Sequence, residues 1–176
     1  MSEFKKTYEG GLFFLTCTVI DWLDVFTRSE YSDILVNNLK YCQEQKGLEL
    51  FSYVIMPNHF HMVASRTTGE MSHLLRDLKS YTAKQVIQMI EENPRESRKK
   101  WLLQQFRFYA KFKQTHKEYT FWQSSNYPVD ITDARIVKQK IEYIHQNPVR
   151  AGYVDEPEHW RYSSAYPLST LRVLEI

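Results

Sequence analysis

Two apolar segments joined by a very short connection constrain the fold of this chain more than any other feature. "LELFSYVIM" (48–56) and "HFHMVAS" (59–65) are rich in β-branched and aromatic residues, a composition typical of strands. Pro57 and Asn58 between them suit a reversal of the chain, and proline cannot donate to the ladder of a central strand. Because so short a connection joins antiparallel neighbours, the sequence predicts a β-hairpin here.

The segments around this hairpin predict one more strand and two helices. "LFFLTCTVI" (12–20) again has the composition of a strand. Residues 29–47 carry apolar side chains at helical spacing, with Ser29 as a possible N-terminal cap and Gly47 where a helix would stop. Residues 71–92 have a strong amphipathic pattern, which predicts a second helix.

The C-terminal half is expected to hold one further helix. Residues 132–147 have helical periodicity, with Thr132 as a plausible cap and Pro148 as the stop, because the residue before a proline avoids the α region. Residues 93–131 are less regular. The order strand, helix, strand, strand, helix fits an antiparallel sheet covered by helices, the α+β class. We therefore expect one domain over residues 1–176, with a basic-aromatic elaboration at about 93–131.

Composition excludes several classes of protein. The sequence contains no apolar run long enough to span a membrane, and its N-terminus has no apolar core of a secretory signal. The two cysteines, Cys17 and Cys42, are too few for a disulfide framework and have no metal-binding spacing. A reduced, cytoplasmic setting is expected.

The formal net charge of +2 hides an uneven distribution. Residues 95–117 contain eight Lys and Arg against one acidic residue, Glu96, and aromatic residues interleave with the cations. Cations neutralise phosphates and aromatic rings stack on unpaired bases, so this mixture suits single-stranded nucleic acid. An amphipathic helix with a solvated basic face and a buried aromatic face explains it equally well. The candidate DNA-binding cations of this segment are Arg98, Lys99, Lys100, Arg107, Lys111 and Lys113.

Two histidines one residue apart open the predicted third strand. Alternation along a strand puts His59, His61 and Val63 on one face, and leaves the apolar residues between them for the other. The Cα atoms of the two histidines are then roughly 6.6 Å apart, so both rings can converge on one divalent cation. Half-buried histidines that are hydrogen-bonded to neighbours are the alternative interpretation, and a metal site needs a third ligand.

The helix before Pro148 offers such a ligand. Lys140, Tyr143 and Asn147 recur at helical spacing and share one face. The amide of Asn147 can supply a neutral oxygen ligand, and the phenol of Tyr143 can supply a nucleophile. A half-buried tyrosine followed by a helix-ending asparagine is the alternative. Tyr81 is a competing nucleophile, with Gln85 four residues further on.

Taken together, the two stretches resemble a known family. "YVIMPNHFHMV" (53–63), followed by "YIHQNPVRAGYV" (143–154), resembles the HUH single-tyrosine transposases of the insertion-sequence type, and is most similar to the REP-associated tyrosine transposases. "LLRDLKSYTAK" (74–84) and "WRYSS" (160–164) are supporting patterns. The resemblance implies the HUH endonuclease architecture, an RRM- or ferredoxin-like antiparallel sheet packed with helices.

The resemblance also implies roles for individual residues. His59 and His61 match the two metal-binding histidines of the family, Asn147 the position of the third ligand, and Tyr143 the nucleophile. The implied reaction uses Mg²⁺ or Mn²⁺ and gives a 5′-phosphotyrosine and a free 3′-OH. The implied substrate is single-stranded DNA with hairpin or palindromic ends.

Further expectations follow from that assignment. Lys140 and Arg150 join the candidate DNA-binding residues. The bacterial cytoplasm, in association with the nucleoid, is the expected location, and a homodimer is a possible assembly.

Two other classes of function remain open from the sequence. A catalytically inactive DNA-binding or regulatory protein could retain the fold, although it would need neither the histidines nor Tyr143. An unrelated metal-dependent hydrolase would need a carboxylate base near the metal, and Asp33, Glu49 and Glu70 have no compelling placement for that role.

Overall fold

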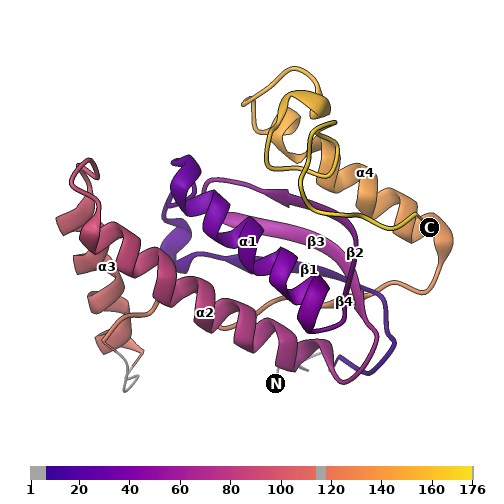
Figure 1. The fold of residues 1–176 in the computed structure, drawn as a ribbon, viewed down its shortest axis with the longest axis horizontal. Coiled ribbons are helices and arrows are strands. Elements are labelled where there is room, and N and C mark those ends of the chain that lie inside the picture. Colours follow the sequence, from indigo (N-terminus) through magenta and orange to yellow (C-terminus); the bar gives the residue numbers. More distant parts are fainter. Residues whose placement is uncertain (1–6, 114–117, 176) are drawn as a thin grey trace.

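A four-stranded antiparallel sheet forms the centre of the protein (Figure 1). The computed structural model describes residues 7–113 and 118–175, so residues 114–117 of the basic segment lie outside it. The spatial order of the strands is β2-β3-β1-β4. Their bounds are Phe13–Thr18 for β1, Leu48–Ile55 for β2, His59–Arg66 for β3 and Val129–Asp130 for β4.

The helices complete a ferredoxin-like α+β fold, as expected from the sequence. Helices α1 and α2 follow β1 and β3, so that the chain runs β1, α1, β2, β3, α2, α3, β4, α4. Helix α3 lies within the segment expected to be irregular. The helices span Ser29–Gln45 (α1), Met71–Glu92 (α2), Lys99–Phe112 (α3) and Ala134–Arg150 (α4), and 3₁₀ turns span Ile20–Trp22 (η1) and Pro157–His159 (η2).

The predicted β2–β3 hairpin is confirmed. Ile55 pairs with Phe60 next to the turn, and Leu48 pairs with Arg66 at the other end. The register shifts between Leu50 and Ser52, where one extra residue in β2 forms an irregularity of the β-bulge type. Strand β3 is also paired with β1 on its other side, so it is a central strand of the sheet.

The sheet separates two apolar clusters. On one face, Phe60 and Met62 of β3 contribute to the main core with residues of α1 and α2. On the other face, Val63 packs with Val137 and Ile144 of α4. Figure 1 shows α1 and α2 on one side of the sheet and α4 on the other. Because alternate residues of a strand face opposite sides, His59 and His61 lie on the same side as α4.

Helix α4 differs from its sequence prediction at both ends. It begins after Asp133, whose side chain accepts a hydrogen bond from the N–H of Arg135, so Asp133 and not Thr132 is the cap. Pro148 does not stop it, since the helix continues to Arg150. A proline in the last turn removes only one helical hydrogen bond. The helix ends instead at Gly152, whose φ of 74° few other residues adopt readily.

The predicted cap of α1 is also wrong. Arg28 occupies the cap position and makes no capping hydrogen bond through its side chain, while Ser29 is the first helical residue. The hydroxyl of Ser29 donates to the adjacent Glu30 instead. Across residues 7–113 and 118–175, no helix is both long and apolar enough to cross a membrane.

Candidate active site

The two histidines of β3 lie side by side at the end of the strand that follows the hairpin turn. The centroids of the His59 and His61 rings are 4.7 Å apart. His61 is buried, whereas His59 is partly exposed. Phe60 between them points into the main core, which anchors the strand beneath the pair. The predicted alternation therefore gives two imidazoles on one rigid strand.

A threonine on the neighbouring strand orients His61. Thr16 of β1 lies directly opposite His61 in the antiparallel register. Its Oγ1 is 2.8 Å from Nδ1 of His61. A hydrogen bond at Nδ1 leaves Nε2 as the ring nitrogen available to a ligand, an arrangement typical of metal-binding histidines.

An asparagine from the hairpin turn orients His59 in the same way. Nδ1 of His59 is 2.6 Å from Oδ1 of Asn58, an oxygen that can only accept. The amide nitrogen of Asn58 donates in turn to Oδ1 of Asp24 over 2.8 Å, which fixes the orientation of the amide. Nδ1 of His59 is therefore the protonated nitrogen, and Nε2 carries the free lone pair.

Burial keeps both imidazoles neutral. It lowers the pKa of His59 to about 4 and that of His61 to about 3, with a further contribution to His61 from the charges of His59 and Lys140. Neutral imidazole is the form that binds a metal ion. Two oriented, neutral nitrogen donors thus fit a divalent cation.

A third metal ligand beside the two histidines would have to be of another residue type. Within the described part of the chain, no three His, Cys, Asp or Glu side chains are placed to hold a metal ion together. Asn147 is half-buried on α4, one turn after Tyr143. Its role as an amide-oxygen ligand remains a prediction.

Helix α4 brings Tyr143 to the histidines. Val137 and Ile144 of this helix are buried against the sheet, as their apolar spacing predicts. The ring centroid of Tyr143 is then 5.4 Å from that of His61 and 5.8 Å from that of Phe14. Tyr143 and both histidines belong to the same chain, so one chain assembles all three.

Two cations flank Tyr143 on its own helix. Nζ of Lys140 lies 5.8 Å from the centroid of the Tyr143 ring and 4.7 Å from that of Phe14. The guanidinium carbon of Arg150 lies 5.6 Å from the centroid of the Tyr143 ring. These charges make the surroundings of the phenol attractive to a phosphate.

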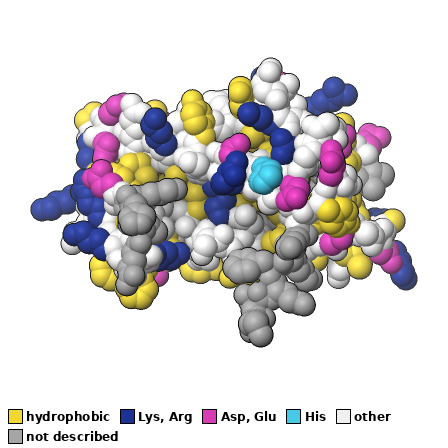
Figure 2. Space-filling view, turned by 90° about the horizontal axis from the view of Figure 1, so that it is seen from below, with side chains coloured by type: hydrophobic (Ala, Val, Ile, Leu, Met, Phe, Trp, Pro, Cys, Tyr) yellow, Lys and Arg dark blue, Asp and Glu magenta, His cyan; other side chains and the backbone are white. Residues whose placement is uncertain are grey.

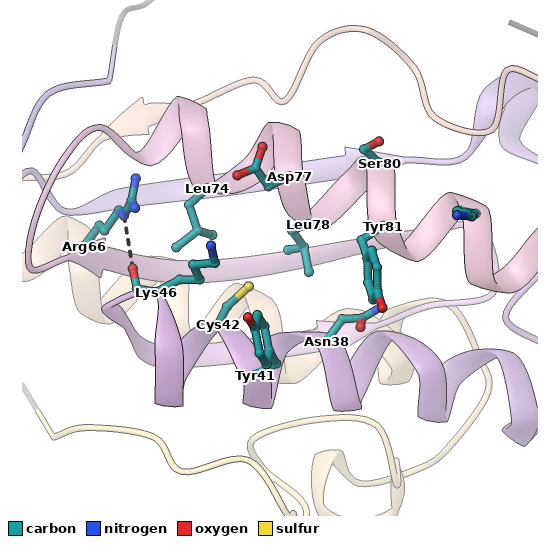
Figure 3. A pocket seen from close by; sticks show the side chains of 11 residues that line it. Asn38, Tyr41, Cys42, Lys46, Arg66, Leu74, Asp77, Leu78, Ser80 and Tyr81 are labelled. Carbon is teal, nitrogen blue, oxygen red and sulfur yellow. Dashed lines mark hydrogen bonds between the residues drawn. The ribbon is translucent and has the colours of Figure 1, made fainter.

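The competing tyrosine lies on the other side of the sheet. Tyr81 belongs to α2 and lines a groove of about 650 Å³ between α1 and α2, together with Tyr41 and Cys42 (Figure 3). Because α2 and α4 cover opposite faces of the sheet, Tyr81 is separated from the histidine pair. Of the two candidate nucleophiles, only Tyr143 contacts a histidine of the pair.

The other candidate DNA-binding cations differ in their surroundings. Arg98 donates to the carbonyl of Asp24, Lys99 to that of Glu91, and Arg107 to Glu118. These three therefore make contacts within the protein. The remaining cations of this group have exposed side chains; they are Lys100, Lys111 and Lys113.

The carboxylates considered for a hydrolase are occupied elsewhere. Asp33 accepts a hydrogen bond from Tyr162, Glu49 from Ser65 and Glu70 from Ser72. None of these partners belongs to the histidine site. Asp33, Glu49 and Glu70 are therefore not placed to act as a base beside the histidines.

Sequence reasoning missed the residues that support the site. Thr16 and Phe14 share the face of β1 that looks toward α4, and alternation along the strand could have identified them once the register was known. Asn58 is next to His59 and was interpreted only as a turn residue. It also accepts a hydrogen bond from His59. Asp24 lies more than thirty residues away along the chain and gave no local signal.

Comparisons with known proteins identify the family. The profile of the family described as "Transposase IS200 like" matches residues 23–112, a segment that includes both histidines and ends before α4. A Haemophilus influenzae protein that carries the name REP-associated tyrosine transposase is 25% identical over 165 residues, which cover 93% of this chain and 85% of that protein.

A solved structure supports the fold in turn. It is described as a REP-associated tyrosine transposase bound to a REP hairpin, and it matches with a TM-score of 0.64 at 17% sequence identity. The match covers 100% of this chain and 95% of the other. At this level of identity, the likeness establishes the α+β fold.

Proposed function

The chain belongs to the IS200-like transposase family, and we propose on this basis that it cleaves and rejoins single-stranded DNA beside a hairpin, with Tyr143 as the nucleophile. The observation that carries the proposal is the contact of Tyr143 with His61, whose ring centroids are 5.4 Å apart. A phenol beside two neutral imidazoles is the combination that a metal-assisted tyrosine nucleophile needs.

In the proposed reaction, Tyr143 exchanges one phosphate ester for another. The phenolic oxygen forms a bond to the phosphorus and loses its proton, while the bond from phosphorus to the 3′-oxygen breaks and that oxygen gains a proton. The products are a 5′-phosphotyrosine and a free 3′-OH. Because the new ester replaces the old one, a 3′-OH can later attack it and rejoin the strand without an external energy source.

His59, His61 and Asn147 are the residues that we propose to hold a divalent metal ion, Mg²⁺ or Mn²⁺. Two imidazoles and an amide carry no negative charge, so the ligand set would not neutralise the cation. When bound, the ion would polarise the scissile phosphate and stabilise charge on the leaving oxygen. Lys140 and Arg150 add positive charge on either side of Tyr143 and would hold the phosphate near the phenol.

The named relatives suggest the partner. One carries the name of a REP-associated transposase and the other is described as bound to a REP hairpin, so we propose hairpin DNA as the substrate. Action on chromosomal DNA would place the protein in the bacterial cytoplasm, with the nucleoid. Since Tyr143 contacts His61 of its own chain, we propose that one chain forms a complete site, whether or not the protein dimerises.

A nicking assay tests this function. Labelled single-stranded hairpin DNA is incubated with Mn²⁺ and the native protein, Tyr143→Phe or Tyr81→Phe. We expect the native protein and Tyr81→Phe to cleave and to form a covalent protein–DNA adduct, and Tyr143→Phe to do neither. Tyr81→Phe is a matched control, because it also removes one hydroxyl from a helix.

Two outcomes would contradict the proposal. Cleavage by Tyr143→Phe at the native rate would exclude Tyr143 as the nucleophile. Tight binding of the hairpin without cleavage of any strand, in Mg²⁺ or in Mn²⁺, would favour the alternative of a regulatory DNA-binding protein.

A further inference from the structure

A strained turn places an exposed tryptophan beside the histidine pair. Asp21 and Trp22 of η1 have φ values of 53° and 55°, a left-handed conformation that is strained for residues other than glycine. Two backbone hydrogen bonds hold the residues just before these two, from the N–H of Val19 to the carbonyl of Asn58 and from the N–H of Ile20 to the carbonyl of Phe121. The turn sets the Trp22 ring 5.6 Å from that of His59, at 71° to it, while the side chain remains 57% exposed.

The same turn connects the histidine site to α3. Tyr109 of this helix is hydrogen-bonded to Asp21, and this interaction with the carboxylate raises the pKa of the tyrosine. The Tyr109 ring packs edge-to-face on Phe108, at 5.2 Å between centroids. A series of neighbouring side chains therefore runs from His59 over Trp22 and Asp21 to the aromatic residues of α3.

One face of α3 carries exposed aromatic rings. Trp101, Phe108 and Phe112 recur at helical spacing on this face, which lies opposite the buried one. Phe108 is 56% and Phe112 is 73% exposed, and their rings are nearly parallel, with an interplanar angle of 16°. Large apolar side chains held in this way without burial indicate a binding surface.

The charge around these rings identifies the occupant. The chain carries no Asp or Glu from Ser97 to Lys117, and the exposed Lys100 and Lys111 flank the aromatic face on one side. Figure 2 shows Lys and Arg side chains around the end of the molecule that α3 forms, beside exposed hydrophobic ones. A second copy of this chain would bring like charges together at this surface. Single-stranded nucleic acid matches it better, because its phosphates suit the cations and its flat bases suit the aromatic rings.

We propose that single-stranded DNA next to the cleaved phosphate passes over Trp22 and stacks its bases on Phe108 and Phe112. This inference rests on the proposed function, and it adds a second DNA contact to the hairpin. Only unpaired bases present free faces for stacking, so the surface holds the single strand and not the hairpin stem. Lys100 and Lys111 contact the phosphates of that strand.

Binding of two DNA probes tests this surface. Both carry the same hairpin, and one adds a single-stranded extension of roughly ten nucleotides, within the range that such surfaces hold. Fluorescence anisotropy is measured in Tyr143→Phe protein without metal, so that no cleavage interferes. Phe108→Ala/Phe112→Ala and Trp22→Ala are compared with Tyr41→Ala, which removes an exposed aromatic ring from the α1–α2 groove.

We expect the Phe108→Ala/Phe112→Ala variant to bind the extended probe at least about tenfold more weakly, because stacking contributes about 1–3 kcal/mol per base. Trp22→Ala should also lower the affinity for the extended probe, and Tyr41→Ala should leave that affinity unchanged. The blunt hairpin should bind all variants equally. An extension that carries 5-iodouracil should cross-link, under ultraviolet light, to peptides containing Trp22, Phe108 or Phe112.

Three results would overturn the inference. In the first, the aromatic variants bind the extended probe as tightly as the parent protein does. In the second, they lose the same affinity for the blunt hairpin as for the extended probe. In the third, the parent protein is a dimer that Phe108→Ala/Phe112→Ala converts to a monomer without changing DNA binding. If one of these results is found but cleavage still depends on Tyr143, the stacking surface is rejected and the proposed function stands. Loss of binding in the aromatic variants without cleavage by any protein would instead reject the function and retain the stacking surface.

Discussion

At the scale of single residues, the proposed chemistry would depend on keeping two imidazoles neutral and correctly oriented. His61 is oriented by Thr16 and His59 by Asn58, and each contact occupies Nδ1. Burial lowers the pKa of both rings far below the ordinary value. Both features would prepare the site for the proposed cation, and each can be tested separately.

The lowered pKa values predict an acid-sensitive fold in the absence of metal. An unfolded histidine takes up a proton near pH 6.5, whereas the folded His59 and His61 do so only near pH 4 and pH 3. As the pH falls below about 6.5, the unfolded state thus binds more protons and the free energy of unfolding decreases. We expect the melting temperature of the metal-free protein to fall between pH 7 and pH 5.

Replacing both histidines by glutamine provides the control. The melting temperature of the double variant should fall less steeply between pH 7 and pH 5. The fall that remains would come in part from His145, because burial lowers its pKa as well. An identical dependence on pH in the native protein and the double variant would show that these imidazoles do not stay neutral in the fold.

The contact of Thr16 with His61 predicts an effect on metal affinity. Thr16→Val keeps the shape of the side chain and removes the hydroxyl that contacts Nδ1 of His61. We expect Mn²⁺ affinity, measured by isothermal titration calorimetry, to fall about 10–100-fold, as for the loss of other residues that orient metal ligands. Thr16→Ser retains a hydroxyl and should restore most of the affinity. Equal affinities in all three proteins would contradict this role.

At the scale of elements, the structure shows which parts of the fold local sequence can predict. The hairpin, the other long strand and the helices α1, α2 and α4 follow from periodicity and turn residues. The end of α4 does not, because Pro148 falls in a last turn that loses little from it and Gly152 supplies the stop. Helix α3 was only the alternative interpretation of the basic segment, and its aromatic face was expected to be buried, whereas Trp101, Phe108 and Phe112 are exposed.

The site itself was predicted to a similar extent. The spacing of His59 and His61 and that of Tyr143 and Asn147 are local, so sequence could place each pair on one face of its element. The contact between the pairs depends on how α4 packs on the sheet, and the sequence suggested it only through family resemblance. Contacts such as that of Asp24 with Asn58 arise from the tertiary fold alone.

One buried carboxylate controls where α3 lies. Glu96 accepts hydrogen bonds from Arg28 and Tyr31 at the start of α1, and from the backbone N–H of Arg98 at the start of α3. Burial opposes its charge, but these hydrogen bonds outweigh that effect and lower the pKa of Glu96 below its ordinary value. Glu96 therefore joins the two helix N-termini as a charged, hydrogen-bonded group.

Removing that charge should destabilise the fold. We expect Glu96→Ala to lower the free energy of unfolding by about 1–3 kcal/mol, because it leaves the buried hydroxyl of Tyr31 without its acceptor. Glu118→Ala is the control, since its ion pair with Arg107 is exposed and solvent screening leaves it little effect on stability. Urea denaturation measures both. Equal losses in the two variants would show that burial gives Glu96 no special role.

At the scale of the whole molecule, we propose that each chain forms a complete site. Tyr143 on α4 contacts His61 on β3 of the same chain. A mixture of His61→Ala with Tyr143→Phe should therefore remain inactive in the nicking assay, because neither chain holds both groups. Restored cleavage in the mixture would show instead that a tyrosine from one chain acts with the histidines of another.

The proposed role of Tyr143 can be tested by identifying the residue that becomes covalently attached to DNA. Native protein is allowed to cleave the hairpin substrate with Mn²⁺, digested with trypsin and analysed by mass spectrometry for peptides that carry a nucleotide. We predict the adduct on the peptide from Ile141 to Arg150, at Tyr143. An adduct on the peptide from Ser80 to Lys84, which contains Tyr81, or cleavage that leaves no adduct, would contradict the account.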